Sequence, residues 1–340
     1  MEARLRRVLH CAVADISHYS GALPLRRFVR HKVAPREGGC VLGLHRVLPR
    51  ESGRKTNCLD GMAITDESFI LLLEYLRKRF RIVPLGNALD DEGAVNGSKP
   101  FCALTFDDGW RDTYQIAFPW LKRCGMPATI FLTTGVVGET GGFWVERFKK
   151  AWVQEDLRDR AEVFLGGLYP RPVRTADFME IIEWLMRMPS GERQALLDHL
   201  LPAAVEHGED VDSMMTWDQA IEMSRAGIEF GAHTVTHPLL TYEDDATIGH
   251  ELLESKRTLE EKLNQPVSAF AYPGGDWDDR VRGLVARAGY TCAFTTQPAW
   301  CRHGQDRYAI GRVLIHEGNV TDAKGRFSPS MVDWTLSGWG

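Results

Sequence analysis

The sequence lacks the marks of several protein classes. Its seven cysteines stand singly, without a CxxC pair or regular spacing, so neither a disulfide framework nor a cysteine zinc site is expected. No apolar stretch approaches the roughly 18 residues of a transmembrane helix. The apolar run that begins at Val8 is interrupted by His10 and stops before Asp15, so it lacks the continuous core of a signal peptide. We therefore expect a cytoplasmic protein.

A strong excess of charge of either sign is also absent. The 41 basic and 46 acidic residues leave a net charge of −5, so no global basic field favours nucleic acid as a partner. Residues 1–36 differ, with eight basic side chains against two acidic ones. We predict that residues 1–37 form a basic amphipathic segment in peripheral contact with the anionic inner face of the membrane. A basic helix packed against the main domain is the alternative. The basic residues are Arg4, Arg6, Arg7, Arg26, Arg27, Arg30, Lys32 and Arg36.

With 340 residues, 44% of them hydrophobic, the chain can form one large α/β domain or two modest ones. Short apolar runs alternate with helical patterns, which predicts parallel strands with crossover connections and a barrel of about seven or eight strands. The predicted strands are Cys40–Leu44, Phe101–Phe106, Ala128–Thr133, Ile228–Ala232, Val267–Tyr272, Thr291–Thr295 and Ile310–Ile315. The clearest predicted helices are Glu67–Arg79, Asp245–Asn264 and Asp279–Ala288.

One long segment, residues 139–215, breaks this alternation. It contains no convincing strand, but amphipathic helical patterns occur at Phe143–Gln154, Thr175–Met188 and Glu192–Glu206. We predict a helical insertion that either covers the barrel mouth as a lid or only packs on its rim. The predicted organisation is thus a barrel at 38–320 that contains this insertion, followed by a C-terminal tail at 321–340.

The densest chemical signal is TFDDGW at residues 105–110. Asp107 and Asp108 stand where a predicted strand ends, and two adjacent carboxylates cannot both be buried without a cation or another strong partner. A bound metal ion explains this pair economically, although DDG is also a common turn sequence.

A second cluster, HTVTH at residues 233–237, also follows a predicted strand. His233 and His237 can converge on one ion if the chain turns there, and Pro238 favours such a turn. Two imidazoles and one carboxylate are typical of a catalytic divalent site with open positions. This donor set favours Zn²⁺, with Co²⁺, Ni²⁺, Mn²⁺ and Fe²⁺ as alternatives.

Together, the two motifs and the order of strands resemble the polysaccharide deacetylases, the family 4 carbohydrate esterases with a nodulation-type homology domain. The resemblance covers residues 38–320 apart from the insertion and implies an α/β fold, a distorted (β/α)7-type barrel. It also implies that Asp107 is the catalytic base and that Asp108, His233 and His237 bind the metal. In such a site the metal polarises the amide carbonyl and lowers the pKa of bound water towards ~7, and the base accepts a proton.

A third motif, FAYPGG at residues 270–275, resembles the family segment whose backbone N–H after the proline faces the oxyanion. Gly274 occupies that position here. The arginine that commonly begins the motif and braces the base is absent, because Ala271 stands in its place. We predict that Arg312 replaces it from another strand; the alternative is that Arg312 lies on the surface.

Two histidines compete for the role of general acid. In many family members the acid closes a late Leu-x-His strand, and His316 matches that form. In a rearranged subset, the poly-N-acetylglucosamine deacetylases, it follows an N-terminal strand, and His45 in VLGLHRV matches that form. We predict that His45 is the acid and that His316 lies at the rim. Trp110 and Trp277 adjoin the motifs and are candidates for stacking on sugar rings.

The predicted function is metal-dependent removal of an N-acetyl group from an amino sugar of a surface polysaccharide or a lipid-linked glycan precursor. One alternative is deformylation of a polyprenyl-linked formamido sugar, which needs the same site and a different acyl pocket. Hydrolysis of a ureide or cyclic amide is more distant. A non-catalytic carbohydrate-binding relic is disfavoured because the predicted base and all the predicted ligands are present. The sequence does not indicate an oligomeric state.

Overall fold

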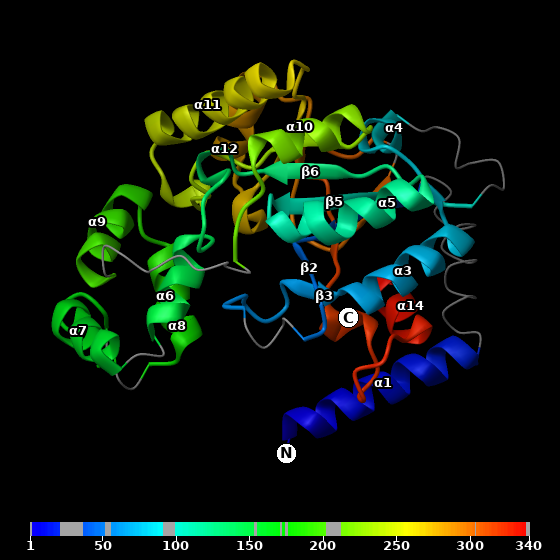
Figure 1. Ribbon diagram of the computed structural model, residues 1–340, viewed down its shortest axis with the longest axis horizontal. Helices are drawn as coiled ribbons and strands as arrows, with labels where there is room; N and C mark the ends of the chain where they lie inside the picture. Colours follow the sequence, from blue (N-terminus) through cyan, green and yellow to red (C-terminus); the bar gives the residue numbers. More distant parts are fainter. Residues whose placement is uncertain are drawn as a thin grey trace.

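A curved, mainly parallel β-sheet lies at the centre of the molecule, with helices packed around it (Figure 1). Its strands follow the order β10-β1-β5-β6-β7-β8-β9. The structure is a computed structural model that describes residues 2–20, 37–51, 56–90, 99–152, 155–170, 172–173, 176–201, 212–302 and 304–337. The strands of the parallel core are β1 (Glu37–Leu44), β5 (Phe101–Asp108), β6 (Thr129–Leu132), β7 (Glu229–Ala232), β8 (Ala269–Ala271) and β9 (Cys292–Phe294).

The sheet curves back on itself through the segment that begins at Ile310. Ile310 forms a parallel bridge with Phe294 of β9, and β11 (Val313–Leu314) then pairs with β1 in parallel. One segment therefore joins the two ends of the parallel sheet, which confirms the predicted (β/α)7-type barrel. The sequence predicts a longer strand here, and the observed one is short because the segment changes partner along its length.

The remaining strands are short. β10 (Trp300–Arg302) pairs with β1 in the antiparallel direction, and β4 (Arg81–Ile82) pairs with β5. β2 (Arg46–Leu48) and β3 (Ala63–Thr65) form a separate two-stranded sheet. All eight residues of β5 are buried, so the central strand is covered on both faces, as expected for a parallel sheet flanked by helices.

Amphipathic helices cover the outside of the barrel. The three clearest predicted helices are present, with bounds within one residue of those read from the sequence: α3 (Asp66–Arg79), α11 (Asp245–Leu263) and α12 (Asp279–Arg287). In α3 the Thr65 hydroxyl caps the first turn by accepting from the Ser68 N–H. The other helices are α4 (Leu85–Asp90), α5 (Phe118–Cys124), α10 (Trp217–Arg225) and α13 (Glu317–Val320), with short turns η3 (Thr113–Ala117), η4 (Thr134–Val136), η6 (Leu240–Tyr242) and η7 (Pro273–Gly275).

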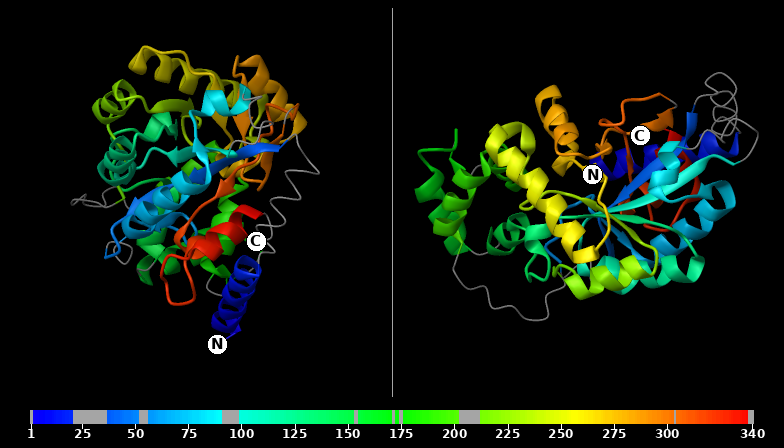
Figure 2. Two further views of the ribbon diagram at one scale, coloured as in Figure 1. Left: turned by 90° about the vertical axis from the view of Figure 1, so that its right-hand side faces the viewer. Right: turned by 90° about the horizontal axis from the view of Figure 1, so that it is seen from above.

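Between β6 and α10 the described part of the chain forms four α-helices beside one end of the barrel (Figures 1 and 2). They have an apolar core of their own, which includes Phe148, Ile182 and Leu197. The sequence predicts three of the four helices, and the additional one is α7. The helices are α6 (Trp144–Trp152), α7 (Glu155–Leu165), α8 (Phe178–Met186) and α9 (Ser190–Leu200).

The two ends of the described chain meet. α1 (Glu2–Tyr19) packs against α14 (Pro329–Ser337) through Cys11, Ala14 and Met331. His18 Nδ1 of α1 lies 2.7 Å from Oδ2 of Asp333, a buried carboxylate of α14. Residues 21–36 of the predicted basic segment, with five of its eight basic side chains, lie outside the described residues. No helix of the described chain is long and apolar enough to cross a membrane.

Candidate active site

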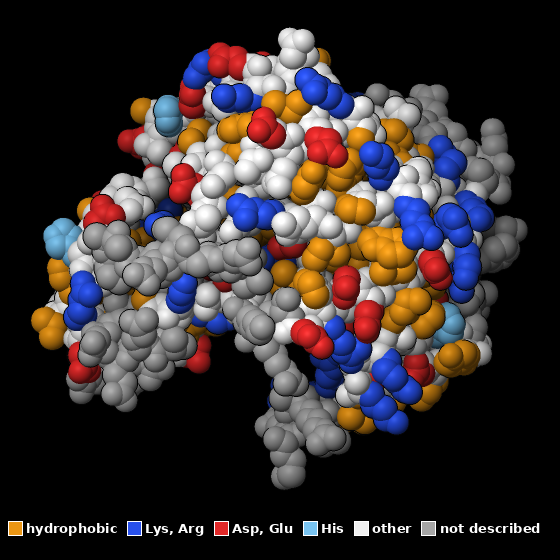
Figure 3. All heavy atoms as spheres, viewed as in Figure 1, with side chains coloured by type: hydrophobic (Ala, Val, Ile, Leu, Met, Phe, Trp, Pro, Cys, Tyr) orange, Lys and Arg blue, Asp and Glu red, His pale blue; other side chains and the backbone are white. Residues whose placement is uncertain are grey.

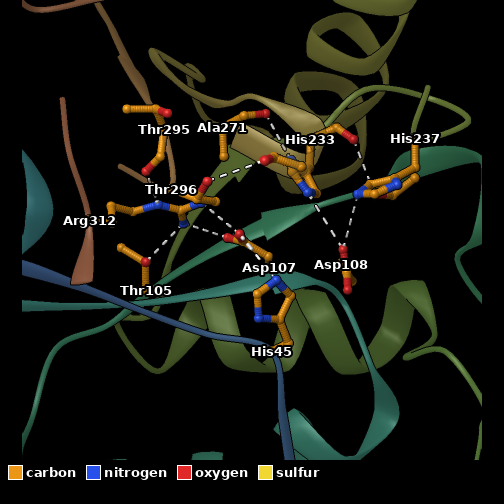
Figure 4. Close-up of polar contacts among 12 residues, drawn as sticks. His45, Thr105, Asp107, Asp108, His233, His237, Ala271, Thr295, Thr296 and Arg312 are labelled. Carbon is orange, nitrogen blue, oxygen red and sulfur yellow. Dashed lines mark hydrogen bonds and ion pairs between the residues drawn. The ribbon is translucent and has the colours of Figure 1, made fainter. Parts of the chain in front are cut away.

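The predicted site residues meet at the carboxyl-terminal edge of the barrel strands (Figure 4). His45 follows β1, Asp107 and Asp108 end β5, His233 follows β7, and Arg312 precedes β11. Parallel strands deliver their carboxyl ends to one edge, so residues far apart in the sequence share one site.

Asp108, His233 and His237 form a cluster whose candidate ligand atoms lie within 4.8 Å of one another. Asp108 Oδ1 is 3.5 Å from His233 Nε2 and 3.6 Å from His237 Nε2. The Trp110 indole donates to Asp108 Oδ2 at 2.9 Å, and Oδ1 is a buried atom without a hydrogen-bond partner among the described residues. Buried polar atoms are normally paired, so a cation held by these three side chains fits the arrangement.

The environment of His233 and His237 favours metal binding by their imidazole rings. His233 Nδ1 lies 2.8 Å from the Ala271 carbonyl, which leaves Nε2 facing Asp108. Burial lowers the pKa of both His233 and His237 to about 4, and the charge of Asp107 only partly opposes this effect. Both rings are therefore neutral near pH 7, which is the form that binds a metal ion.

The backbone around this cluster adopts an unusual conformation. Asp108, Thr234 and His237 have φ values of 76°, 67° and 60°, and they are three of the four non-glycine residues with positive φ in the described chain. Such conformations persist only where the surroundings enforce them. Glu251 of α11 supplies that support by accepting from the Val235 N–H at 2.6 Å, the Thr236 N–H at 3.0 Å and the Thr236 hydroxyl at 2.6 Å.

Asp107 is held by Arg312. The guanidinium donates to both carboxylate oxygens, at 2.6 and 2.7 Å, and the two side chains are only 2% and 0% exposed. Burial alone raises the pKa of Asp107, but Arg312 outweighs it and holds this pKa well below the usual range. Arg312 also donates to the Thr105 hydroxyl at 3.1 Å. The structure thus places Arg312 against the predicted base and not on the surface.

The two candidate acids occupy different environments. His45 Nε2 lies 3.8 Å from Asp107 Oδ2, and its side chain lines the cavity at the barrel mouth. His316 instead caps α13, where Nδ1 accepts from the Gly318 N–H at 3.1 Å, and it does not line that cavity. This geometry favours His45, whose role as the acid stays a prediction.

Gly274 also lines the cavity, with a φ of 62°. This positive φ favours glycine, and a Cβ atom here would lie 2.8 Å from Leu239 Cδ2, so a larger residue would also displace the end of the Leu239 side chain. Its position beside the cluster is compatible with the predicted donation to an oxyanion, which stays a prediction.

The cavity has a volume of about 270 Å³ and lies between the barrel mouth and the four-helix insertion. Two charged side chains of the insertion, Glu146 and Arg193, also line it. Trp110 is buried under Phe143, so it braces Asp108 and offers little ring surface to a sugar, and Trp277 stacks on Tyr272 outside the cavity lining. The apolar walls are Leu59, Met62, Phe143, Trp144, Val145, Met186, Leu239 and Leu314.

A buried polar network not found from the sequence joins the insertion to the barrel. Arg46 pairs with Asp112 at 2.9 Å and with Asp212 at 2.5 Å, and its guanidinium lies 4.2 Å from the Trp110 ring centre. Because Asp212 stands where the chain returns from the insertion, the network fixes that return beside the site. The sequence assigns no role to either Arg46 or Glu251. Arg46 follows His45 in VLGLHRV, which is the only available signal, and Glu251 belongs to none of the motifs.

Known proteins resemble this chain in sequence and in fold. The family model for polysaccharide deacetylase matches residues 94–293. The fold is similar to that of IcaB from Ammonifex degensii, with a TM-score of 0.56 and 22% identity over 88% of this chain and 97% of that one. It is also similar to that of a Streptococcus pyogenes deacetylase, PplD, solved with acetate, with a TM-score of 0.54 and 20% identity over 86% of this chain and 98% of that one.

Among curated proteins, the chain is 23% identical over 228 residues to YxkH of Bacillus subtilis strain 168, a provisionally assigned polysaccharide deacetylase. That match covers 67% of this chain and 56% of the relative, so this chain spans just over half of that protein's length. Placement within the rearranged subset stays a prediction. Because the family model spans more than half of the sequence and includes both the TFDDGW and HTVTH motifs, the chain belongs to the polysaccharide deacetylase family.

Proposed function

We propose that this protein is a metal-dependent hydrolase that removes the N-acetyl group from an amino sugar of a polysaccharide or lipid-linked glycan. The observation that carries the proposal is the position of Asp107, braced by Arg312, beside the cluster of Asp108, His233 and His237 at the floor of one cavity. The family supports deacetylation of a glycan, and the lipid-linked form is the finer part of the proposal.

Each residue has a distinct task in this reaction. A divalent ion held by Asp108, His233 and His237 supplies carbonyl polarisation and an acidified water. Asp107, kept ionised by Arg312, accepts the proton of the attacking water. His45 donates a proton to the leaving nitrogen, which makes the amine a better leaving group. The Gly274 N–H donates to the carbonyl oxygen as negative charge develops there.

The donor set supports zinc as the ion. One carboxylate and two neutral imidazoles form a typical three-residue catalytic zinc site with a remaining open position. We expect about one divalent ion per purified chain and loss of activity after treatment with a chelator. Elemental analysis of the purified protein, followed by reconstitution with single metals, identifies the ion.

The reaction is tested with a matched pair of oligosaccharides that carry N-acetyl or N-formyl groups. The proposal expects acetate release by the wild type and its loss in Asp107→Asn, which keeps the metal. Release of formate alone would identify a deformylase. Metal-loaded protein that binds the glycans and releases neither acid would identify a carbohydrate-binding relic.

We further propose that the protein docks peripherally on the anionic, cytoplasmic face of a membrane through α1. One face of α1 packs on α14, and the opposite face exposes Leu9, Val13 and Ile16. The lower right edge of Figure 3, where α1 lies, carries apolar side chains beside Lys and Arg side chains, with Asp and Glu side chains among them. Basic residues attract an anionic leaflet by about 1 kcal/mol each, and shallow apolar insertion adds to this.

Docking is tested by sedimentation of the full chain with anionic and neutral vesicles at low and high salt. Leu9→Glu should weaken binding to anionic vesicles, because it places a negative charge on the exposed face of α1. Leu253→Glu is the matched control, since Leu9 and Leu253 are 58% and 57% exposed. Equal effects of the two substitutions, or binding that does not respond to salt, would overturn this proposal.

A further inference from the structure

Arg193, on α9 of the insertion, is a buried cation without an ion-pair partner among the described residues. Its side chain is only 5% exposed, and burial lowers the pKa of its guanidinium. In the described chain it donates one hydrogen bond, from Nη1 to the Met188 carbonyl at 3.3 Å. A guanidinium carries five N–H donors, so most of its hydrogen-bonding capacity is unused.

The Arg193 side chain lines the same cavity as the candidate metal ligands. Its guanidinium lies 5.2 Å from the centre of the Trp144 ring, in a cation–π contact that limits its orientation.

The nearest buried carboxylates do not neutralise this charge by direct contact. Glu243 accepts from the Ser190 N–H at 2.6 Å, and Glu251 accepts from the loop that carries the histidines. Their charges act on Arg193, but neither carboxylate forms an ion pair with it among the described residues. A buried cation without a partner is unfavourable, and an anion that enters the cavity would remove that cost.

We propose that Arg193 binds an anionic group of the glycan, a phosphate or a carboxylate next to the acyl-bearing sugar. The inference rests on the proposed function, because it takes the cavity as the place where the glycan binds. A guanidinium forms bidentate, charge-assisted hydrogen bonds with either group, and the apolar walls strengthen them by excluding water. The substrate class is thereby narrowed to anionic glycans or glycolipids.

The test compares the binding of neutral and anionic sugars to the metal-loaded full chain. Dissociation constants for N-acetylglucosamine and N-acetylglucosamine 1-phosphate are measured for the wild type and for Arg193→Gln. The preference for the phosphate should fall by about tenfold to a hundredfold in Arg193→Gln, as expected for a lost hydrogen bond to a charged group. A disaccharide of N-acetylglucosamine and glucuronic acid forms the second arm and distinguishes a carboxylate from a phosphate.

Two further variants separate recognition from a structural role. Arg187→Gln is the matched control, because Arg187 lies in the same insertion but is 62% exposed and pairs with Glu183 at the surface. This variant should keep the preference for the phosphate. Arg193→Lys should keep part of it, since the positive charge remains. The metal ion itself attracts anions, so the decisive quantity is the change in preference on substitution.

The outcomes distinguish this inference from the proposed function. Arg193→Gln could weaken the binding of neutral and anionic sugars equally, or leave the binding of both unchanged. In either case Arg193 only supports the structure, and the inference is overturned. Acetate release is measured separately. A preference that depends on Arg193 in a protein that releases no acetate would sustain the inference and reject the deacetylase function.

Discussion

The barrel mouth and the helical insertion face the same cavity but hold their polar side chains in different ways. On the barrel, Asp107 and Asp108 each have dedicated partners, in Arg312 and Trp110. On the insertion, Glu146 accepts one backbone hydrogen bond and Arg193 donates one, although both are buried. This difference indicates that the barrel is organised for the reaction itself, whereas the insertion retains capacity for contacts with a substrate.

Hydrogen bonds and an ion pair nevertheless fix the position of the insertion on the barrel. Its first and last residues pair with each other, since Met214 donates to the Glu139 carbonyl and Gly138 donates to the Met215 carbonyl, both at 2.9 Å. The pair formed by Arg46 and Asp212 anchors the same point. The two regions therefore form one cavity, and substitutions in each should have separable effects on turnover.

The largest effect on turnover is expected at the barrel. His233→Ala and His237→Ala should abolish both metal retention and activity, because each removes one of three candidate ligands. Asp107→Asn should abolish turnover while metal remains bound. Elemental analysis together with acetate release measures both properties, and full activity of Asp107→Asn would reject Asp107 as the base.

Arg312→Gln should have the next largest effect on turnover, and it should also destabilise the protein. It leaves a buried carboxylate unpaired, which costs about 3–5 kcal/mol in the free energy of unfolding. The control is Arg326→Gln, which breaks an exposed pair with Asp322 and should cost less than about 1 kcal/mol. Denaturant titration measures the difference. Equal costs for the two variants would show that Asp107 does not depend on Arg312.

His45→Ala should lower the turnover number by roughly 10²–10⁴. His316→Ala should have a smaller effect, because its ring caps α13 away from the cavity. Steady-state kinetics on the same glycan compare the two variants. The opposite order would assign the acid to His316 and place the chain with the unrearranged members of the family.

Removal of the helical insertion tests its contribution to turnover separately from that of the barrel. Replacing about residues 140–211 by a short Gly/Ser linker keeps Asp212, so that Arg46 retains this partner. The shortened protein should still bind metal and cleave a small activated acetate ester, but kcat/KM on the glycan should fall by about tenfold or more, because contacts remote from the reacting bond are lost. Unchanged kcat/KM on the glycan would mean that the insertion only packs on the rim.

Glu146→Gln is expected to have the smallest effect on turnover. Its main effect should be on how the stability of the protein depends on pH. Burial raises the pKa of Glu146 to about 8, so its side chain is mostly protonated in the folded protein at neutral pH. A raised folded-state pKa stabilises the protein at low pH, and this stabilisation is lost as pH rises from about 4.5 to about 8. Glu146→Gln should therefore lose less stability over that pH range than the wild type. Thermal unfolding at pH 5 and pH 8.5 checks this, and parallel changes in both proteins would contradict it.

Much of the barrel could be predicted from the sequence because its signals are local. Apolar runs and helical periodicity locate strands such as Phe101–Asp108 and helices such as Asp245–Leu263 within a few residues. The TFDDGW and HTVTH motifs are each contiguous and follow strands, so their meeting at one edge follows from parallel topology. These two motifs were sufficient to predict the family and the three residues of the candidate metal cluster.

Contacts between distant segments were decided only by the tertiary structure. Asp107 and Arg312 are 205 residues apart, and they meet because the segment that begins at Ile310 closes the barrel between β9 and β1. The closing segment also decides between His45 and His316 as the residue that faces the cavity, since both end strand-like runs. Arg193 shows no local pattern at all. Its burial depends on how the four helices of the insertion pack on the barrel. Short-range periodicity in the sequence does not predict that packing.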